Sequence, residues 1–101
     1  MQFSDYQPLL ETVFEEHLTH QGASIVTRRN YRMDIRQFLG WIVDSLSPEE
    51  RSQLSDHKSL VNVISAERLE SYKRDQRLQQ IPVSTVNRRL SALRTLLKCM
   101  L

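Results

Sequence analysis

The spacing of apolar and polar residues that is typical of a helix is clearest in residues 84–101. Apolar side chains recur there at steps of four, three, four and three, at Val86, Leu90, Leu93, Leu97 and Met100. This spacing places them on one face of an α-helix. We expect Ser84 to be the N-cap of this helix, because serine is favoured at that position. The other positions include four cations and no acidic residue, which predicts one buried face and one cationic face.

The same periodicity predicts three further main helices. The first runs from about Pro8 to His20, and Gly22 is expected to end it in a left-handed conformation. The second runs from an N-cap at Ser24 to about Asp44, and the third covers residues 65 to about 78. The expected buried face of the second helix carries Tyr31, Ile35, Phe38 and Ile42, with Leu39 and Trp41 at its edges.

Residues 45–64 show a weaker pattern. Ser47, Pro48 and Glu50 match a capping box with proline at the first helical position, which predicts a short helix to about Leu54. Residues 55–59 are expected to form a loop. The apolar run 60–64 has no second strand to pair with, so we interpret it as a buried connector.

Length and composition favour a single all-α domain. The chain has 101 residues, with only two glycines and three prolines, and shows little strand-type alternation. A chain of this size supports one domain with a modest core. We therefore expect residues 1–101 to form one compact bundle of about four main helices, with one extra short helix within residues 45–64.

Several classes of protein are disfavoured by what the sequence lacks. No apolar run approaches the roughly 20 residues of a membrane span, and the first residues do not resemble a secretory signal. The single cysteine, Cys99, excludes an internal disulfide and fits a reducing cytoplasm. No metal-ligand cluster, phosphate loop or nucleophile–base arrangement is visible, so we expect no cofactor, no metal and no catalytic residue.

Charge is segregated along the chain although the net charge is only +2. Residues 1–23 carry a net −4 and residues 44–64 a net −2, whereas residues 24–43 carry +3 and residues 65–101 carry +5. Alternating blocks of this kind predict one electropositive surface, built by the second and last main helices. Ordinary solvated helix faces would give the same composition, so charge alone leaves both interpretations open.

The polar face of the last helix carries the residue types that bind DNA. Arginine can bind guanine through two hydrogen bonds and asparagine can bind adenine in the same way, while serine, threonine and lysine contact phosphates or base edges. Helical geometry places Arg94 on the flank of this face. Arg89 falls nearer the apolar side, which predicts a salt bridge or a phosphate contact. The residues expected opposite the apolar stripe are Ser84, Asn87, Arg88, Ser91, Thr95 and Lys98.

The order of these residues also resembles a known family. The pattern "S-x-x-T…Y…D-I…F…W" from Ser24 to Trp41, followed by "S-T-V-N-R-R-L-S-A-L-R" over residues 84–94, is similar to the core-binding domain of tyrosine recombinases, the phage-integrase and Xer-like family. The resemblance implies a SAM-like helical bundle that binds double-stranded DNA at a recombination site, alongside other recombinase protomers. It also implies a catalytic domain downstream, with the isolated domain monomeric and not itself an enzyme.

The resemblance further implies which residues face DNA. In this family the second and last main helices supply the DNA contacts, and the charge pattern selects the same two helices. The expected DNA-binding residues are Thr27, Arg28, Arg29, Arg32, Ser84, Thr85, Asn87, Arg88, Ser91 and Arg94.

Two other functions remain open. A helical protein–protein interaction module without DNA binding would use the same kind of bundle, because fold does not determine function. It would be recognised by an exposed apolar patch. A helix-turn-helix repressor fits less well, since the residues before Ser84 lack the short spacing that this motif requires.

Overall fold

The computed structural model describes the backbone of residues 3–54 and 57–100, and the side chains of residues 12–54 and 59–100. These parts of the chain contain helices and no strand, which confirms the all-α prediction. The six helices are α1 (Phe3–His20), α2 (Ile25–Ser45), α3 (Pro48–Ser52), α4 (His57–Val63), α5 (Ala66–Leu78) and α6 (Val83–Met100).

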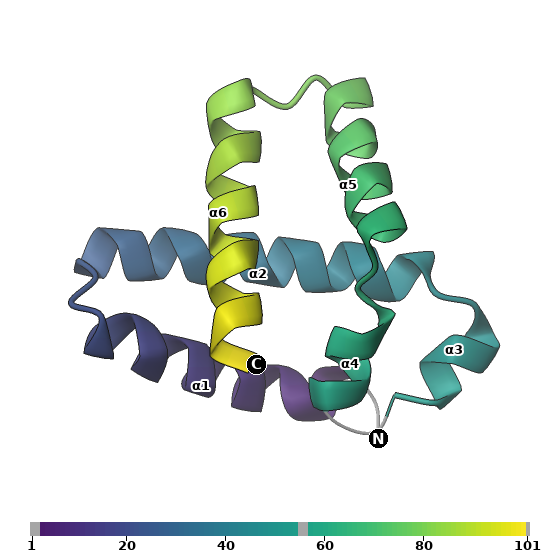
Figure 1. The fold of residues 1–101 in the computed structure, drawn as a ribbon, viewed down its shortest axis with the longest axis horizontal. Coiled ribbons are helices and arrows are strands. Elements are labelled where there is room, and N and C mark those ends of the chain that lie inside the picture. The colour runs from purple at the N-terminus through teal and green to yellow at the C-terminus, as the bar shows by residue number, and fades with distance from the viewer. Residues whose placement is uncertain (1–2, 55–56, 101) are drawn as a thin grey trace.

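Helices α1 and α2 run side by side in opposite directions, and α6 crosses them (Figure 1). The most extensive helix pairing is between α2 and α6, and the C-terminal half of α6 continues on to α1 and α4. Helices α5 and α6 form an antiparallel hairpin whose tip, residues 79–82, projects beyond α2. The N-terminal part of α6 is therefore held away from α1 and lies near the surface.

The core forms where α1, α2, α5 and α6 meet. Tyr72 of α5 is fully buried and packs against two aromatic rings of α2, with ring centroids 5.0 Å from Phe38 and 5.0 Å from Trp41. This aromatic contact docks α5 onto α2 and so orients the hairpin that carries α6. The buried apolar residues are Phe14, Leu18, Ile35, Phe38, Leu39, Ile42, Leu46, Leu54, Leu60, Tyr72, Ala92, Leu93 and Leu96.

Three serines begin helices as the sequence predicts. The hydroxyl oxygens of Ser24, Ser47 and Ser65 each accept a backbone N–H three residues ahead, at 3.1 Å. Glu50 completes the capping box by accepting the Ser47 N–H at 3.1 Å. Gly22 has a φ of 76°, the left-handed conformation expected at the end of α1. Local sequence therefore accounts for the main helix boundaries around α2, α3 and α5.

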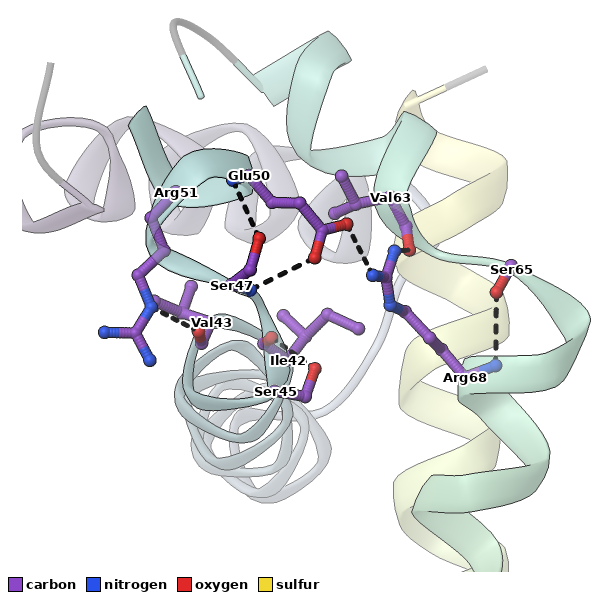
Figure 2. A network of polar contacts seen from close by, with 9 residues as sticks. All are labelled: Ile42, Val43, Ser45, Ser47, Glu50, Arg51, Val63, Ser65 and Arg68. Carbon is purple, nitrogen blue, oxygen red and sulfur yellow. Dashed lines mark hydrogen bonds and ion pairs between the residues drawn. The ribbon is translucent and has the colours of Figure 1, made fainter. Parts of the chain in front are cut away.

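The connector between α2 and α5 is joined to α5 by an ion pair, as Figure 2 shows. The Arg68 guanidinium lies 2.6 Å from the Glu50 carboxylate and also donates to the carbonyl of Val63 at 2.8 Å. The Ser47 backbone N–H, followed by Arg68, lowers the pKa of Glu50 below its ordinary value. Arg51 donates to the Val43 carbonyl at 2.9 Å, which holds α3 against the end of α2.

Two predicted elements differ from the structure. Ser84 is not the N-cap of the last helix, because α6 already begins at Val83 and the N–H of Val86 donates to the Pro82 carbonyl at 3.0 Å. Proline can occupy this position because only its carbonyl is needed there. Residues 57–63 form α4 instead of a loop and a connector. Its apolar positions were too few to show a period, and burial of Leu60 in the core stabilises this short helix.

Helices α1 and α2 also differ in detail. Helix α1 begins at Phe3 rather than near Pro8, so Pro8 lies within the helix, where it cannot donate the usual backbone hydrogen bond to the residue four positions earlier. In α2, Leu39 is fully buried, not at an edge, because α1 covers this side of the helix.

The apolar stripe of α6 is broader than predicted. Ala92, Leu93 and Leu96 are buried, whereas Leu90, Leu97 and Met100 pack against the core and remain partly exposed. Leu90 and Leu97 line a shallow groove with Ala66 and Leu69 of α5. Helix α6 therefore packs on two sides, against α2 and against α5.

Within the described residues, no helix is both long and apolar enough to cross a membrane.

Candidate nucleic-acid interface

An aspartate and an arginine join the two helices at their crossing. Asp34 of α2 is only 3% exposed, and it accepts two hydrogen bonds from Arg88 of α6, from Nε and from Nη2, each at 2.9 Å. The side chain of Arg88 is 43% exposed. Hydrogen bonding to the carboxylate raises the pKa of Arg88 above its ordinary value. The guanidinium therefore lies at the rim of the crossing, with its inner edge bound to Asp34.

Arg89 is held on the inner side of the same crossing. Its Nη1 donates to Oε1 of the buried Gln76 at 3.0 Å, and its Nε lies 4.0 Å from Asp34. Of the two roles that the sequence left open for Arg89, the structure shows the salt bridge. Tyr72 adjoins this cluster and donates a hydrogen bond to Gln37, and burial raises the pKa of Tyr72 to about 12. A polar network thus connects α2, α5 and α6.

Two of the predicted arginines of α2 face α1 instead of α6. Arg28 donates to the Thr19 hydroxyl at 3.0 Å, and Arg32 lies 3.7 Å from the Glu15 carboxylate. Residues two positions apart point to opposite sides of a helix, which places Arg32 and Asp34 on different flanks of α2. The expectation that the cations of both helices converge on one surface is therefore wrong for Arg28 and Arg32. Their contact with DNA stays a prediction.

The other predicted residues of α2 lie near its N-terminal end. Thr27 is half-buried, and its hydroxyl oxygen accepts a hydrogen bond from the Ser24 hydroxyl at 3.0 Å. Arg29 is exposed and has no hydrogen-bond or ion-pair partner among the residues that the structure describes. Arg29 is therefore the predicted arginine of α2 whose guanidinium is available to a ligand.

The outer face of α6 holds the remaining predicted residues. Ser84, Asn87, Arg88 and Arg94 are exposed, as is Lys98. Thr85 and Ser91 are half-buried. Within the described side chains, Arg94 and Lys98 have no hydrogen-bond or ion-pair partner. Because α6 contains no acidic residue, this outer face is cationic along its length.

Two further exposed cations, both on α5, were not among the predicted residues. Arg74 and Arg77 of α5 are exposed and lack a partner in the part of the chain that the structure describes. Cations alternate with acids in the sequence of α5, a pattern typical of a solvated surface. Two of its acids have other partners: Glu70 lies 3.1 Å from Lys73, and Asp75 accepts the indole N–H of Trp41 at 3.1 Å. Sequence spacing alone did not indicate which cations remain unpaired.

Comparison with known families agrees with the helical fold. Residues 12–101 match the family model of the phage integrase N-terminal SAM-like domain. The chain belongs to this family. The resemblance to the tyrosine recombinase core-binding domain is thereby confirmed, together with a role as a domain of a recombinase. No curated protein and no solved structure matches the chain at a significant level.

Proposed function

We propose that this phage integrase N-terminal domain binds double-stranded DNA through the outer face of α6. The observation that carries the proposal is a helix face with three exposed cations, Arg88, Arg94 and Lys98, on a helix without acidic residues. Cations of this kind neutralise phosphates and release condensed counterions, which supplies most of the affinity of DNA-binding proteins. Asn87 on the same face can add contacts with base edges.

In the parent protein, this domain would work together with a separate domain that carries out the chemistry. Breaking and rejoining of DNA strands would belong to a separate catalytic domain of a tyrosine recombinase. The present domain would bind one side of the recombination site and work beside the domains of other protomers. Thr27 and Arg29, near the start of α2, would add contacts at the end of the surface, and Ser84, Thr85 and Ser91 would contribute hydroxyl groups.

Titration of the 101-residue chain with a random-sequence DNA duplex tests this function. We expect binding at low salt, measured by fluorescence anisotropy, that weakens steeply as salt increases. The slope of log K against log[salt] should be close to −0.9 for each phosphate contacted. Absence of binding at low salt, or an affinity that does not depend on salt, would refute DNA binding by this domain.

A matched pair of variants tests the surface. Arg94→Gln and Arg51→Gln each remove one positive charge, but Arg51 lies on α3, well away from α6 (Figure 1). Arg94→Gln should weaken binding several-fold and reduce the steepness of the salt slope by about one phosphate contact. Arg51→Gln should change both quantities much less. Equal effects of the two variants would contradict the proposed surface.

A protein–protein interaction module is the second candidate, and one observation favours it. Val26, Arg29 and Met33 share the outward face of α2, and Val26 and Met33 are 55% and 59% exposed. Exposed apolar side chains on one face can form a contact surface. Self-association of the domain at moderate salt, detected by analytical ultracentrifugation and abolished by Met33→Ser, would support this function. A monomer under these conditions would remove its support.

A further inference from the structure

Asp34 is an unexpected residue at a surface proposed to bind DNA. Its carboxylate is buried almost directly beneath the exposed guanidinium of Arg88. At 3% exposure it is too buried to contact a phosphate, and its negative charge opposes the approach of one. An acid at this position weakens the attraction for DNA. Its presence there therefore indicates a structural or positioning role.

The geometry of the pair indicates that role. Asp34 accepts from Nε and Nη2 of Arg88, both at 2.9 Å, so it occupies one complete edge of the planar guanidinium. Arginine carries five N–H donors, of which these hydrogen bonds use two. The other edge, formed by Nη1 and the second N–H of Nη2, remains available to a second acceptor. The two oxygens of a phosphate match that edge.

The residues around the pair keep it in this orientation. On the inner side, the positive charge of Arg89 partly offsets the negative charge of the Asp34 carboxylate, from which its Nε lies 4.0 Å away. Arg89 also donates a hydrogen bond to Gln76. Two arginines therefore share one carboxylate, and the cluster keeps a net charge of +1. Because Asp34 and Gln76 are both buried, the cluster has little freedom to rearrange. Arg88 is thus fixed before any ligand binds.

We propose that Asp34 is a positioning residue for DNA binding, which fixes Arg88 so that its free edge binds a DNA phosphate. Asp34 acts on DNA only through Arg88. This inference rests on the proposed function, and it assigns a role to a residue that does not touch the ligand. Holding a long side chain in its bound orientation removes the entropy cost of ordering it on binding.

The sign of the effect separates positioning from simple electrostatics. Asp34→Asn adds one unit of positive charge, so long-range attraction alone predicts tighter DNA binding. Loss of positioning predicts weaker binding in spite of the added charge. Asp44→Asn is the matched control, because Asp44 is exposed on the same helix and its carboxylate has no hydrogen-bond or ion-pair partner among the described residues. It makes the same change of charge away from Arg88.

The experiment measures affinity for random-sequence duplexes, and its salt dependence, with the 101-residue chain. We expect Asp44→Asn to bind as tightly as the wild type or slightly more tightly. Asp34→Asn should bind roughly five- to tenfold more weakly, as for loss of one ordinary hydrogen bond. In an Arg88→Ala background, Asp34→Asn should cause no further weakening. The loss should be similar for duplexes of different sequence, as a phosphate contact requires.

A second variant keeps the test valid if Asp34→Asn fails to fold, which circular dichroism would reveal. Arg88→Lys retains the charge but lacks the second edge, so it should bind DNA more weakly than the wild type, although less weakly than Arg88→Ala, which also loses the charge. Wild-type binding by Arg88→Lys, or binding by Asp34→Asn as tight as by Asp44→Asn, would overturn the positioning role alone. A wild-type domain that does not bind DNA would overturn the proposed function as well.

Discussion

In the described part of the chain, two acid–arginine pairs join distant segments through side-chain hydrogen bonds, and the two pairs differ in their exposure to solvent. Asp34 and Arg88 connect α2 with α6 across 54 residues of sequence, and Glu50 and Arg68 connect α3 with α5 across 18. Asp34 is 3% exposed, whereas the side chain of Glu50 is 37% exposed. The two pairs use the same chemical groups at hydrogen-bonding distance, so differences between them reflect their surroundings.

The comparison shows that burial determines how much a pair of charges matters to the fold. Removing one member of a buried pair leaves a charge without water or partner, and the cost is large. An exposed pair loses little when broken, since water replaces the partner. The Asp34–Arg88 pair therefore ties α2 to α6 at a buried position, whereas Glu50 mainly completes the start of α3.

The largest expected effect is on the free energy of unfolding after loss of the buried acid. Asp34→Ala should lower it by about 2–3 kcal/mol, less than for a fully buried pair because Arg88 can turn toward water. Glu50→Ala should lower it by much less. Urea denaturation of both variants measures the difference. Equal losses would show that burial does not distinguish the two pairs.

The next effect is a loss of stability at alkaline pH, which we expect from Tyr72 beside the buried pair. In the folded protein the pKa of Tyr72 is raised to about 12, whereas an unfolded tyrosine ionises near about 10. Between these values the unfolded state binds fewer protons, so stability should fall as pH rises above about 10. By about pH 11 the loss should reach about 1 kcal/mol relative to Tyr72→Phe. Parallel pH profiles of unfolding for the two proteins would contradict this prediction.

A more stable parent protein would make both unfolding measurements more precise. Gly40 lies inside α2, where an added Cβ meets no atom within 4 Å. Gly40→Ala should therefore raise the free energy of unfolding by about 0.5–1 kcal/mol. Gly22→Ala is the control, because the space around Gly22 is equally open but its φ is 76°. That variant should be destabilised, and stabilisation of both would contradict the explanation from backbone conformation.

The smallest expected effect concerns the exposed pair at acid pH. The pKa of Glu50 is lowered from its ordinary value of 4.5 by the Ser47 backbone N–H and by Arg68. Its contribution to stability is therefore present above that ordinary value and is lost as pH falls through the lower, folded pKa. Glu50→Gln should flatten this acid limb slightly, measured by urea denaturation between neutral pH and about pH 3. An unchanged acid limb would show that these hydrogen bonds do not favour the ionised form in the fold.

Much of the fold was predictable because its signals are local. Ser24, Ser47 and Ser65 cap helices through backbone groups three residues away, and such short-range contacts can be recognised in sequence. Helix α4 was missed because seven residues are too few to show a period. The family was also recognisable, since the order of residues from Ser24 to Arg94 reflects the complete domain.

The main helices, the caps at Ser24, Ser47 and Ser65 and the cationic character of α6 follow from the amino-acid sequence, because these features depend on neighbouring residues. Which cations remain available to a ligand depends on how the helices pack. Arg32 forms an ion pair with Glu15 of α1, and Arg88 forms one with Asp34 of α2. Arg94 has no partner in the described part of the chain. Helical periodicity gives the direction of a side chain from its own helix, but its partner is set by how the helices pack.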